Sequence, residues 1–104
     1  MFELPFFTWS TGFFQANYNK DISIKTLSAG FNINAAYLGQ LFKNETGEML
    51  TNYLNNLRIE KAKEMLQNTT LKAYEISEMV GYSNTNYFYR IFKKITGVSP
   101  TDYR

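Results

Sequence analysis

Residues 36–47 read AYLGQLFKNETG, and residues 86–97 read NYFYRIFKKITG. At this offset of fifty, five residue types recur at the same positions. The pairs are Tyr37 with Tyr87, Phe42 with Phe92, Lys43 with Lys93, Thr46 with Thr96, and Gly47 with Gly97. Because Thr51 and Tyr53 also recur, as Thr101 and Tyr103, the chain carries a duplicated motif.

The match continues upstream with an offset of forty-nine, so the second copy has one extra residue at its turn. Residues 31–34 read FNIN, and residues 80–83 read VGYS. Asn32 is thereby paired with Gly81, and these residue types best tolerate a left-handed backbone. We expect both in a tight bend between two helices, with Asn34 and Ser83 as the N-caps that follow.

Each copy predicts a helix of about eight residues, a short turn and a second helix of about twelve, which is the outline of a helix-turn-helix. Gly47 and Gly97 are expected to end the second helices as C′ glycines. An ordinary hairpin of two helices would show the same apolar spacing, and the repeat favours the DNA-binding form. The predicted core consists of Leu27, Phe31, Ile33, Leu38, Leu41 and Phe42 in the first copy, and of Ile76, Val80, Tyr82, Phe88, Ile91 and Phe92 in the second.

Residues 48–67 contain no proline or glycine and predict one long helix between the copies, ended by residues 68–70. Its apolar residues form two stripes, so its start is expected to pack on the first copy and its end on the second. The stripes are Leu50, Tyr53, Leu54 and Leu57, then Ile59, Ala62, Met65 and Leu66. The remaining face, with Glu60, Lys61, Lys63 and Glu64, is expected to be solvated charge.

The length of this linker helix suggests a binding geometry. Twenty helical residues span about 30 Å, and successive major-groove faces of B-DNA recur about 34 Å apart. We therefore expect two recognition helices in adjacent major grooves. Because the copies run in tandem, the site should be asymmetric. The expected organisation is an N-terminal segment with the start of the first helix at 1–20, a first helix-turn-helix at 21–47, the linker helix at 48–67, and a second helix-turn-helix with a C-terminal helix at 68–104.

The positions that the core leaves free on each second helix predict a DNA-reading face. These are Ala35, Ala36, Gly39, Gln40 and Lys43 in the first copy, and Thr85, Asn86, Tyr89, Arg90, Lys93 and Lys94 in the second. Arg90 can bond guanine O6 and N7, Asn86 can pair with adenine, and Thr85 can make a hydroxyl or methyl contact. Lys93 and Lys94 would meet phosphates, and no acidic residue lies between Met79 and Thr101. The alternative is a solvated basic face.

The first face is poorer in hydrogen-bonding groups than the second. Its two alanines and its glycine permit close backbone approach and contact with thymine methyl groups, which leaves Gln40 as the strong reader of a base edge. At the end of the chain, Ser99 and Pro100 predict the N-cap and first residue of a last helix.

Composition argues against catalysis. The 104 residues include no histidine and no cysteine, which excludes imidazole or thiolate chemistry and metal ligation by those groups. Asp21 and Asp102 are the chain's two aspartates, and the formal net charge is +2. No enzyme activity, cofactor or metal is therefore expected. Residues 1–14 lack the basic region and the run of ~20 apolar residues of a membrane segment, and a short first helix is expected around Thr8 to Tyr18.

Several separate motifs, in order, resemble the DNA-binding domain of the AraC/XylS family over about residues 20–104. They are YLGQLFK at 37–43, YLNNLRIEKAK at 53–63, VGYS at 80–83, the segment from Tyr87 to Pro100, and Tyr103-Arg104. The residues of these motifs are most similar to those in the C-terminal output domain of YesN-type response regulators.

The resemblance implies an all-α, seven-helix domain of a cytoplasmic bacterial transcription regulator. It also implies that outward positions of the third and sixth helices enter the major groove. These positions correspond to Ala35, Ala36, Gly39 and Gln40, and to Thr85, Asn86, Tyr89 and Arg90. Three features depart from the family pattern: Gln40 stands where arginine is common, Met49 replaces a capping serine, and Phe13-Phe14 makes the first helix atypical. Such regulators usually carry a second domain, a ligand sensor or a phosphorylated receiver, which we expect outside this chain. RNA polymerase is a further candidate partner.

Two other functions stay open at this stage. A helical protein-interaction module would use the aromatic surface and show little salt dependence, whereas DNA binding weakens steeply as salt rises. A single-stranded nucleic-acid binder would stack bases on the eight tyrosines and nine phenylalanines. Most of these aromatics have core spacing, with Tyr89 as the main expected exposed exception.

Overall fold

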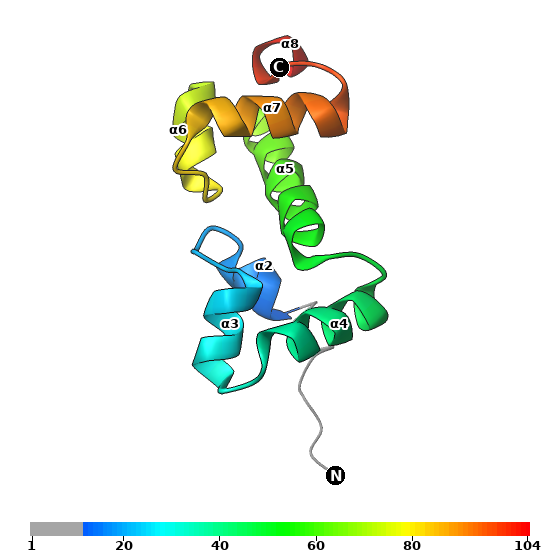
Figure 1. Ribbon diagram of the computed structural model, residues 1–104. Coiled ribbons are helices and arrows are strands. Elements are labelled where there is room, and N and C mark those ends of the chain that lie inside the picture. Colours follow the sequence, from blue (N-terminus) through cyan, green and yellow to red (C-terminus); the bar gives the residue numbers. More distant parts are fainter. Residues whose placement is uncertain (1–11) are drawn as a thin grey trace. The chain divides into compact units, whose positions relative to one another are not determined.

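The computed structural model describes residues 12–104, which form seven α-helices and no strand (Figure 1). The helices are α2 (Phe14–Asn17), α3 (Ile24–Phe31), α4 (Ala35–Thr46), α5 (Leu50–Asn68), α6 (Ala73–Met79), α7 (Thr85–Thr96) and α8 (Pro100–Tyr103). The all-α prediction is confirmed. The chain divides into two compact units, Met1–Leu54 and Asn55–Arg104, with the boundary inside α5. The first part of the helix expected from Thr8 lies outside the described residues, and its described part is helical over α2.

The first unit is built on the α3–α4 pair, which a short turn connects (Figure 1). Leu38 and Phe42 of α4 are buried, together with Leu27 of α3. Three aromatic rings complete this core: Phe14 of α2 lies 5.7 Å from Phe42 and 5.4 Å from Tyr53 of α5, measured between ring centroids. Burying side chains of this size contributes about 1.5–3 kcal/mol each, so the first turn of α5 belongs to the core of the first unit.

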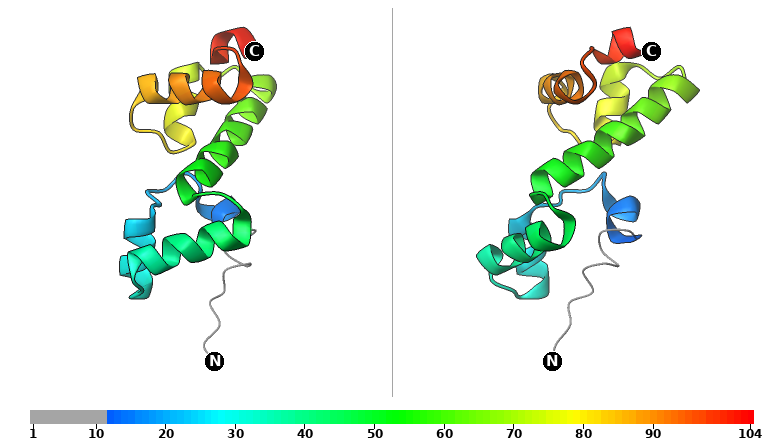
Figure 2. Two further views of the ribbon diagram at one scale, coloured as in Figure 1. Left: turned by 45° about the vertical axis from the view of Figure 1, so that its right-hand side comes forward. Right: turned by 90° about the vertical axis from the view of Figure 1, so that its right-hand side faces the viewer.

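The second unit repeats the arrangement with α6 and α7, and α8 folds back beside α7 (Figure 2). Val80, Phe88 and Phe92 are fully buried. The second apolar stripe of α5 faces this core, since Ile59 and Ala62 are fully buried and Leu66 is 2% exposed. The start of the linker helix therefore packs in the first unit and its later part, from Ile59 on, packs in the second.

Positive backbone φ angles occur at the positions that the sequence predicted. Asn32 has φ 54° and Gly81 has φ 106° in the bends between the paired helices. Gly47 and Gly97 end α4 and α7 with φ 84° and 90°. Most L residues are strained in this region, but glycine has no Cβ atom and asparagine has a short polar side chain that tolerates it. This explains why asparagine or glycine occupies these places.

Two of the sequence predictions about local structure are wrong. The N-cap of α7 is Asn84 rather than Ser83, and its side chain accepts from the Tyr87 N–H at 3.0 Å, as Asn34 does from Tyr37. Because α4 and α7 correspond at the offset of fifty, the extra residue lies before the cap.

The second error concerns Phe31, which is 46% exposed instead of forming core, whereas its counterpart Val80 is fully buried. Phe31 is still helical as the last residue of α3, while Val80 lies beyond α6 with φ −91° and ψ 3°. The predicted core residues Ile33, Leu41 and Ile91 are half-buried.

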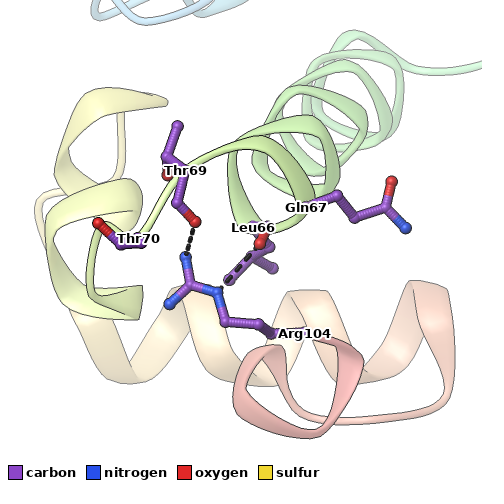
Figure 3. Close-up of a pocket in the computed structure, with 5 residues that line it drawn as sticks. All are labelled: Leu66, Gln67, Thr69, Thr70 and Arg104. Carbon is purple, nitrogen blue, oxygen red and sulfur yellow. Dashed lines mark hydrogen bonds between the residues drawn. The ribbon is translucent and has the colours of Figure 1, made fainter.

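The C-terminal end of α5 is closed by Arg104 (Figure 3). Its Nε donates to the Leu66 carbonyl and its Nη2 to the Thr69 carbonyl, both at 3.0 Å. The last carbonyls of a helix lack intrahelical partners and carry partial negative charge, so a cationic double donor is well suited to them. These residues, with Gln67 and Thr70, line an open hollow.

Candidate nucleic-acid interface

The predicted reading face of the first copy lies on α4, opposite its buried side. Leu38 and Phe42 point into the core and are at most 1% exposed. Ala35, Ala36, Gln40 and Lys43 are exposed and Gly39 is partly exposed. Since these positions lie on one side of the same helix, α4 presents all five predicted residues together.

This face is hollowed rather than filled. A depression of about 300 Å³ is lined by Ile24, Ala36, Gly39, Gln40, Lys43, Met49, Leu50 and Thr51. A Cβ atom at Gly39 would lie 4.0 Å from the Ile24 side chain, which is ordinary contact, so the glycine leaves space. Sequence reasoning missed Ile24, Met49 and Thr51 because they come from the start of α3 and the start of α5.

Gln40 is held by a neighbour one turn along α4. Its Nε2 donates to Asn44 Oδ1 at 2.9 Å. A glutamine amide has a second N–H and a carbonyl oxygen, which is the donor and acceptor pair that the major-groove edge of adenine matches. Asn44 therefore orients Gln40 without using up its hydrogen-bonding capacity.

The second reading face lies on α7, which buries Phe88 and Phe92 on its core side. Asn86, Tyr89, Arg90, Lys93 and Lys94 are exposed, and Thr85 is half-buried. Position by position, Asn86 replaces Ala36, Tyr89 replaces Gly39, Arg90 replaces Gln40 and Lys94 replaces Asn44. The second face is therefore bulkier and more cationic than the first.

A row of two stacked tyrosine rings with an arginine at each end starts at Arg90. The Arg90 guanidinium carbon is 5.4 Å from the Tyr87 ring centroid, and the Tyr87 ring is 5.8 Å from that of Tyr82. On the other side of Tyr82, the Arg58 guanidinium carbon is 5.2 Å from its ring centroid. The sequence offered one signal, the i, i+3 spacing of Tyr87 and Arg90 on a helix, but gave no reason to include Tyr82 and Arg58.

Asn55 of α5 bonds both tyrosines of this row. The Tyr82 hydroxyl donates to Asn55 Oδ1 at 2.6 Å, and Asn55 Nδ2 donates to the Tyr87 hydroxyl oxygen at 3.4 Å. Burial raises the pKa of the Tyr82 hydroxyl far above its ordinary value, and the nearby Arg58 charge opposes that rise only in part. Tyr82 is therefore a neutral donor at any physiological pH.

More aromatic side chains are exposed than the sequence predicted. Besides Tyr89 at 38%, the exposed rings include Tyr37 at 59%, Tyr74 at 55% and Phe31 at 46%. Tyr37 and Tyr89 lie on α4 and α7, whereas Phe31 and Tyr74 lie on α3 and α6. The expectation that Tyr89 is the main exposed aromatic is therefore wrong.

Two copies of a helix, a tight turn and a second helix with a solvent-facing polar side define a tandem helix-turn-helix protein. Among residues 12–104, no helix is both long and apolar enough to cross a lipid bilayer.

Comparison with known proteins agrees with this class. A family described as "Helix-turn-helix domain" matches residues 27–104. The uncharacterized transcriptional regulatory protein YesN of Bacillus subtilis is 42% identical over 74 residues, which are 69% of this chain and 20% of YesN.

Two solved structures have the same fold. The C-terminal domain of the response regulator AraT from Geobacillus stearothermophilus is 34% identical, with a TM-score of 0.89 and coverage of 97% of this chain and 84% of that one. The C-terminal domain of the response regulator yesN from Fusobacterium nucleatum is 35% identical, with a TM-score of 0.86 and coverage of 91% and 93%. The chain belongs to the AraC/XylS family of helix-turn-helix domains found in transcription regulators. It spans 20% of the length of YesN and 22% of the length of the xylose operon regulatory protein of Escherichia coli.

Proposed function

We propose that this chain binds double-stranded DNA sequence-specifically, with α4 and α7 in adjacent major grooves of one asymmetric site. One observation carries the proposal: two equivalent helices each present a polar side to solvent. The opposite side of α4 buries Leu38 and Phe42, and the opposite side of α7 buries Phe88 and Phe92. A helix is the element that fits the major groove, and its outward side chains are the ones that reach base edges.

In the second copy, Arg90 bonds guanine O6 and N7, and Asn86 pairs with adenine. Thr85 and Tyr89 contact neighbouring bases or sugar, and the exposed amines of Lys93 and Lys94 meet phosphates. The charge of this face contributes to affinity for any duplex, whereas Arg90 and Asn86 supply the preference for a sequence.

In the first copy, Gln40 reads adenine in the orientation that Asn44 gives it. Ala36 and Gly39 line the hollow in which a thymine methyl group fits, Ala35 permits close approach of the backbone, and Lys43 meets a phosphate. The two copies thus read different bases, which makes the site asymmetric.

The linker helix sets the spacing between the two helix-turn-helix segments, 21–47 and 68–104. Its 19 residues span roughly 28 Å at 1.5 Å per residue, which is comparable to the ~34 Å repeat of the major groove.

In its wider role, this chain is the non-catalytic DNA-binding domain of a bacterial, cytoplasmic transcription regulator. A ligand-sensing or phosphorylated receiver domain would control it, and RNA polymerase would be its partner at a promoter. Its similarity to the C-terminal domains of two response regulators supports the receiver as the controlling domain.

Selection from random duplexes, followed by competition, tests the proposal. We expect one enriched duplex motif, an affinity that falls steeply between low and moderate salt, and weak competition by either single strand. Arg90→Ala should cost about 1–3 kcal/mol on the selected duplex and relax the preference at one base pair. An Arg90→Ala variant with unchanged affinity and motif would show that α7 does not read DNA in this way. Equal competition by single strands would favour base stacking on the aromatics instead.

A further inference from the structure

We infer that Tyr87 is a positioning residue for Arg90, and that Asn55 and Tyr82 hold Tyr87 in place from the core of the second unit. The inference rests on the proposed function, because it assumes that Arg90 reads a base. It assigns a role in recognition to residues that do not themselves face outward from α7.

Tyr87 is fixed at three points. Its backbone N–H donates to Asn84 Oδ1 at 3.0 Å, its hydroxyl oxygen accepts from Asn55 Nδ2 at 3.4 Å, and its ring lies against Tyr82. Tyr82 is 5% exposed and donates to Asn55 at 2.6 Å. The Tyr87 ring is therefore a surface whose position is set by the half-buried Asn55 and the buried Tyr82.

The guanidinium of Arg90 lies over this surface. A guanidinium stacked on an aromatic face keeps its N–H donors in its own plane, available to a partner at its edge. Guanine requires two parallel donors to O6 and N7. A free arginine loses rotamer entropy when it adopts that geometry, and the ring reduces the loss by restricting the side chain beforehand.

The first copy provides a natural contrast. Tyr37 occupies the same place on α4, and its backbone N–H donates to Asn34 Oδ1 at 3.0 Å. However, Tyr82 corresponds to Ile33 and Arg90 to Gln40, and Tyr37 is 59% exposed while Tyr87 is half-buried. The ring-and-cation row is thus present in the copy that carries an arginine, and Tyr37 serves as a matched control.

The test is a double-mutant cycle on base discrimination. Affinity of the full chain is measured for the selected duplex and for a duplex in which the base pair read by Arg90 is replaced, and the ratio is the discrimination. We expect Tyr87→Leu to reduce this ratio about twofold to fivefold, the range of an exposed cation–π contact. Tyr87→Phe keeps the ring and its contact with Tyr82 but lacks the hydroxyl that accepts from Asn55, so it should lose less discrimination than Tyr87→Leu. Tyr37→Leu should leave the ratio unchanged. In an Arg90→Ala background, Tyr87→Leu should have no further effect on the ratio.

Failure of the inference is distinct from failure of the proposed function. If Arg90→Ala lowers discrimination but Tyr87→Leu does not, or if Tyr87→Leu still lowers it without Arg90, Tyr87 does not position the arginine. If Arg90→Ala leaves discrimination intact, Arg90 does not read a base, and the proposed function of α7 is contradicted rather than the role of Tyr87. Thermal unfolding followed by circular dichroism identifies variants that lose the fold. Tyr87→Met, which replaces the ring by a flexible side chain, must give the same loss as Tyr87→Leu.

Discussion

The rings of Phe92 and Tyr103 meet edge to face, with centroids 5.5 Å apart and planes at 79°. Fifty residues earlier, Phe42 and Tyr53 meet in the same way, at 5.3 Å and 86°. In both copies a threonine one helical turn beyond the phenylalanine adds a hydrogen bond at the end of the helix. The Thr46 hydroxyl donates to the Phe42 carbonyl, and the Thr96 hydroxyl donates to the Phe92 carbonyl, both at 2.8 Å. Each recognition helix is therefore anchored at its C-terminal end by the same three residue types.

Removing the anchoring ring should destabilise the unit that contains it. Phe92→Ala is expected to lower the free energy of unfolding by about 3–5 kcal/mol, the usual cost of deleting a buried phenylalanine. Urea denaturation followed by circular dichroism measures the loss, and hydrogen exchange shows where it falls. The matched variant Phe42→Ala should reduce protection mainly in residues 12–54. Equal loss of protection in both units from either variant would contradict their description as separate cores.

The helix-ending glycines should resist substitution, while an ordinary helical glycine should not. Gly97→Ala places a Cβ atom at φ 90°, so we expect a loss of about 1–2 kcal/mol. Gly30→Ala lies within α3, where a Cβ atom would meet nothing within 4 Å, so it should stabilise by about 0.5–1 kcal/mol. Thermal melts of the two variants compare them directly. A Gly97→Ala variant as stable as the parent would show that the end of α7 does not require glycine at this position.

Ser77 should be replaceable by alanine with a gain in stability. Its hydroxyl is fully buried and has no hydrogen-bond partner among the described residues, whereas Ser28, its counterpart, donates to the Lys25 carbonyl at 3.0 Å. An unpaired buried hydroxyl costs about 1–3 kcal/mol, so Ser77→Ala should raise the unfolding free energy by about 1 kcal/mol. Ser28→Ala should gain less, because it also gives up a bond. The reverse order in urea titrations would show that Ser77 has a partner in solution.

Gln40→Arg should change the base preference of the first copy alone. Arginine replaces a donor–acceptor pair by two donors, so one adenine in the selected site should become guanine while the positions read by α7 stay the same. Repeating the duplex selection with this variant measures the change. A shift in the half-site read by Arg90, or no shift at all, would show that Gln40 does not face the bases.

Local signals explain why most of the fold could be predicted from the sequence. The offset between copies, the left-handed positions at Asn32 and Gly81, and the two apolar stripes of α5 follow from residue type and spacing. The N-cap of α7 was misplaced by one residue because the sequence match alone does not say on which side of Ser83 the extra residue lies. Phe31 was misassigned because an apolar residue at the end of a helix satisfies the core spacing whether or not it is covered.

Part of the candidate site could likewise be predicted from the sequence, and part could not. The outward residues of α4 and α7 follow from helical periodicity once the core positions are known. The hollow beside Gly39 and the row behind Arg90 join residues from different elements, such as Asn55 with Tyr87, 32 positions apart. Such contacts depend on how helices pack against one another, which no local pattern of the sequence encodes.

The proposed spacing of the two contacts is tested most directly by hydroxyl-radical footprinting of the full chain on its selected duplex. Two protected patches about one helical turn apart, on the same face of the DNA, are the expected result. Arg90→Ala should weaken one patch more than the other, because the two helices read different half-sites. A single protected patch, or two patches on opposite faces, would contradict binding by α4 and α7 in adjacent major grooves.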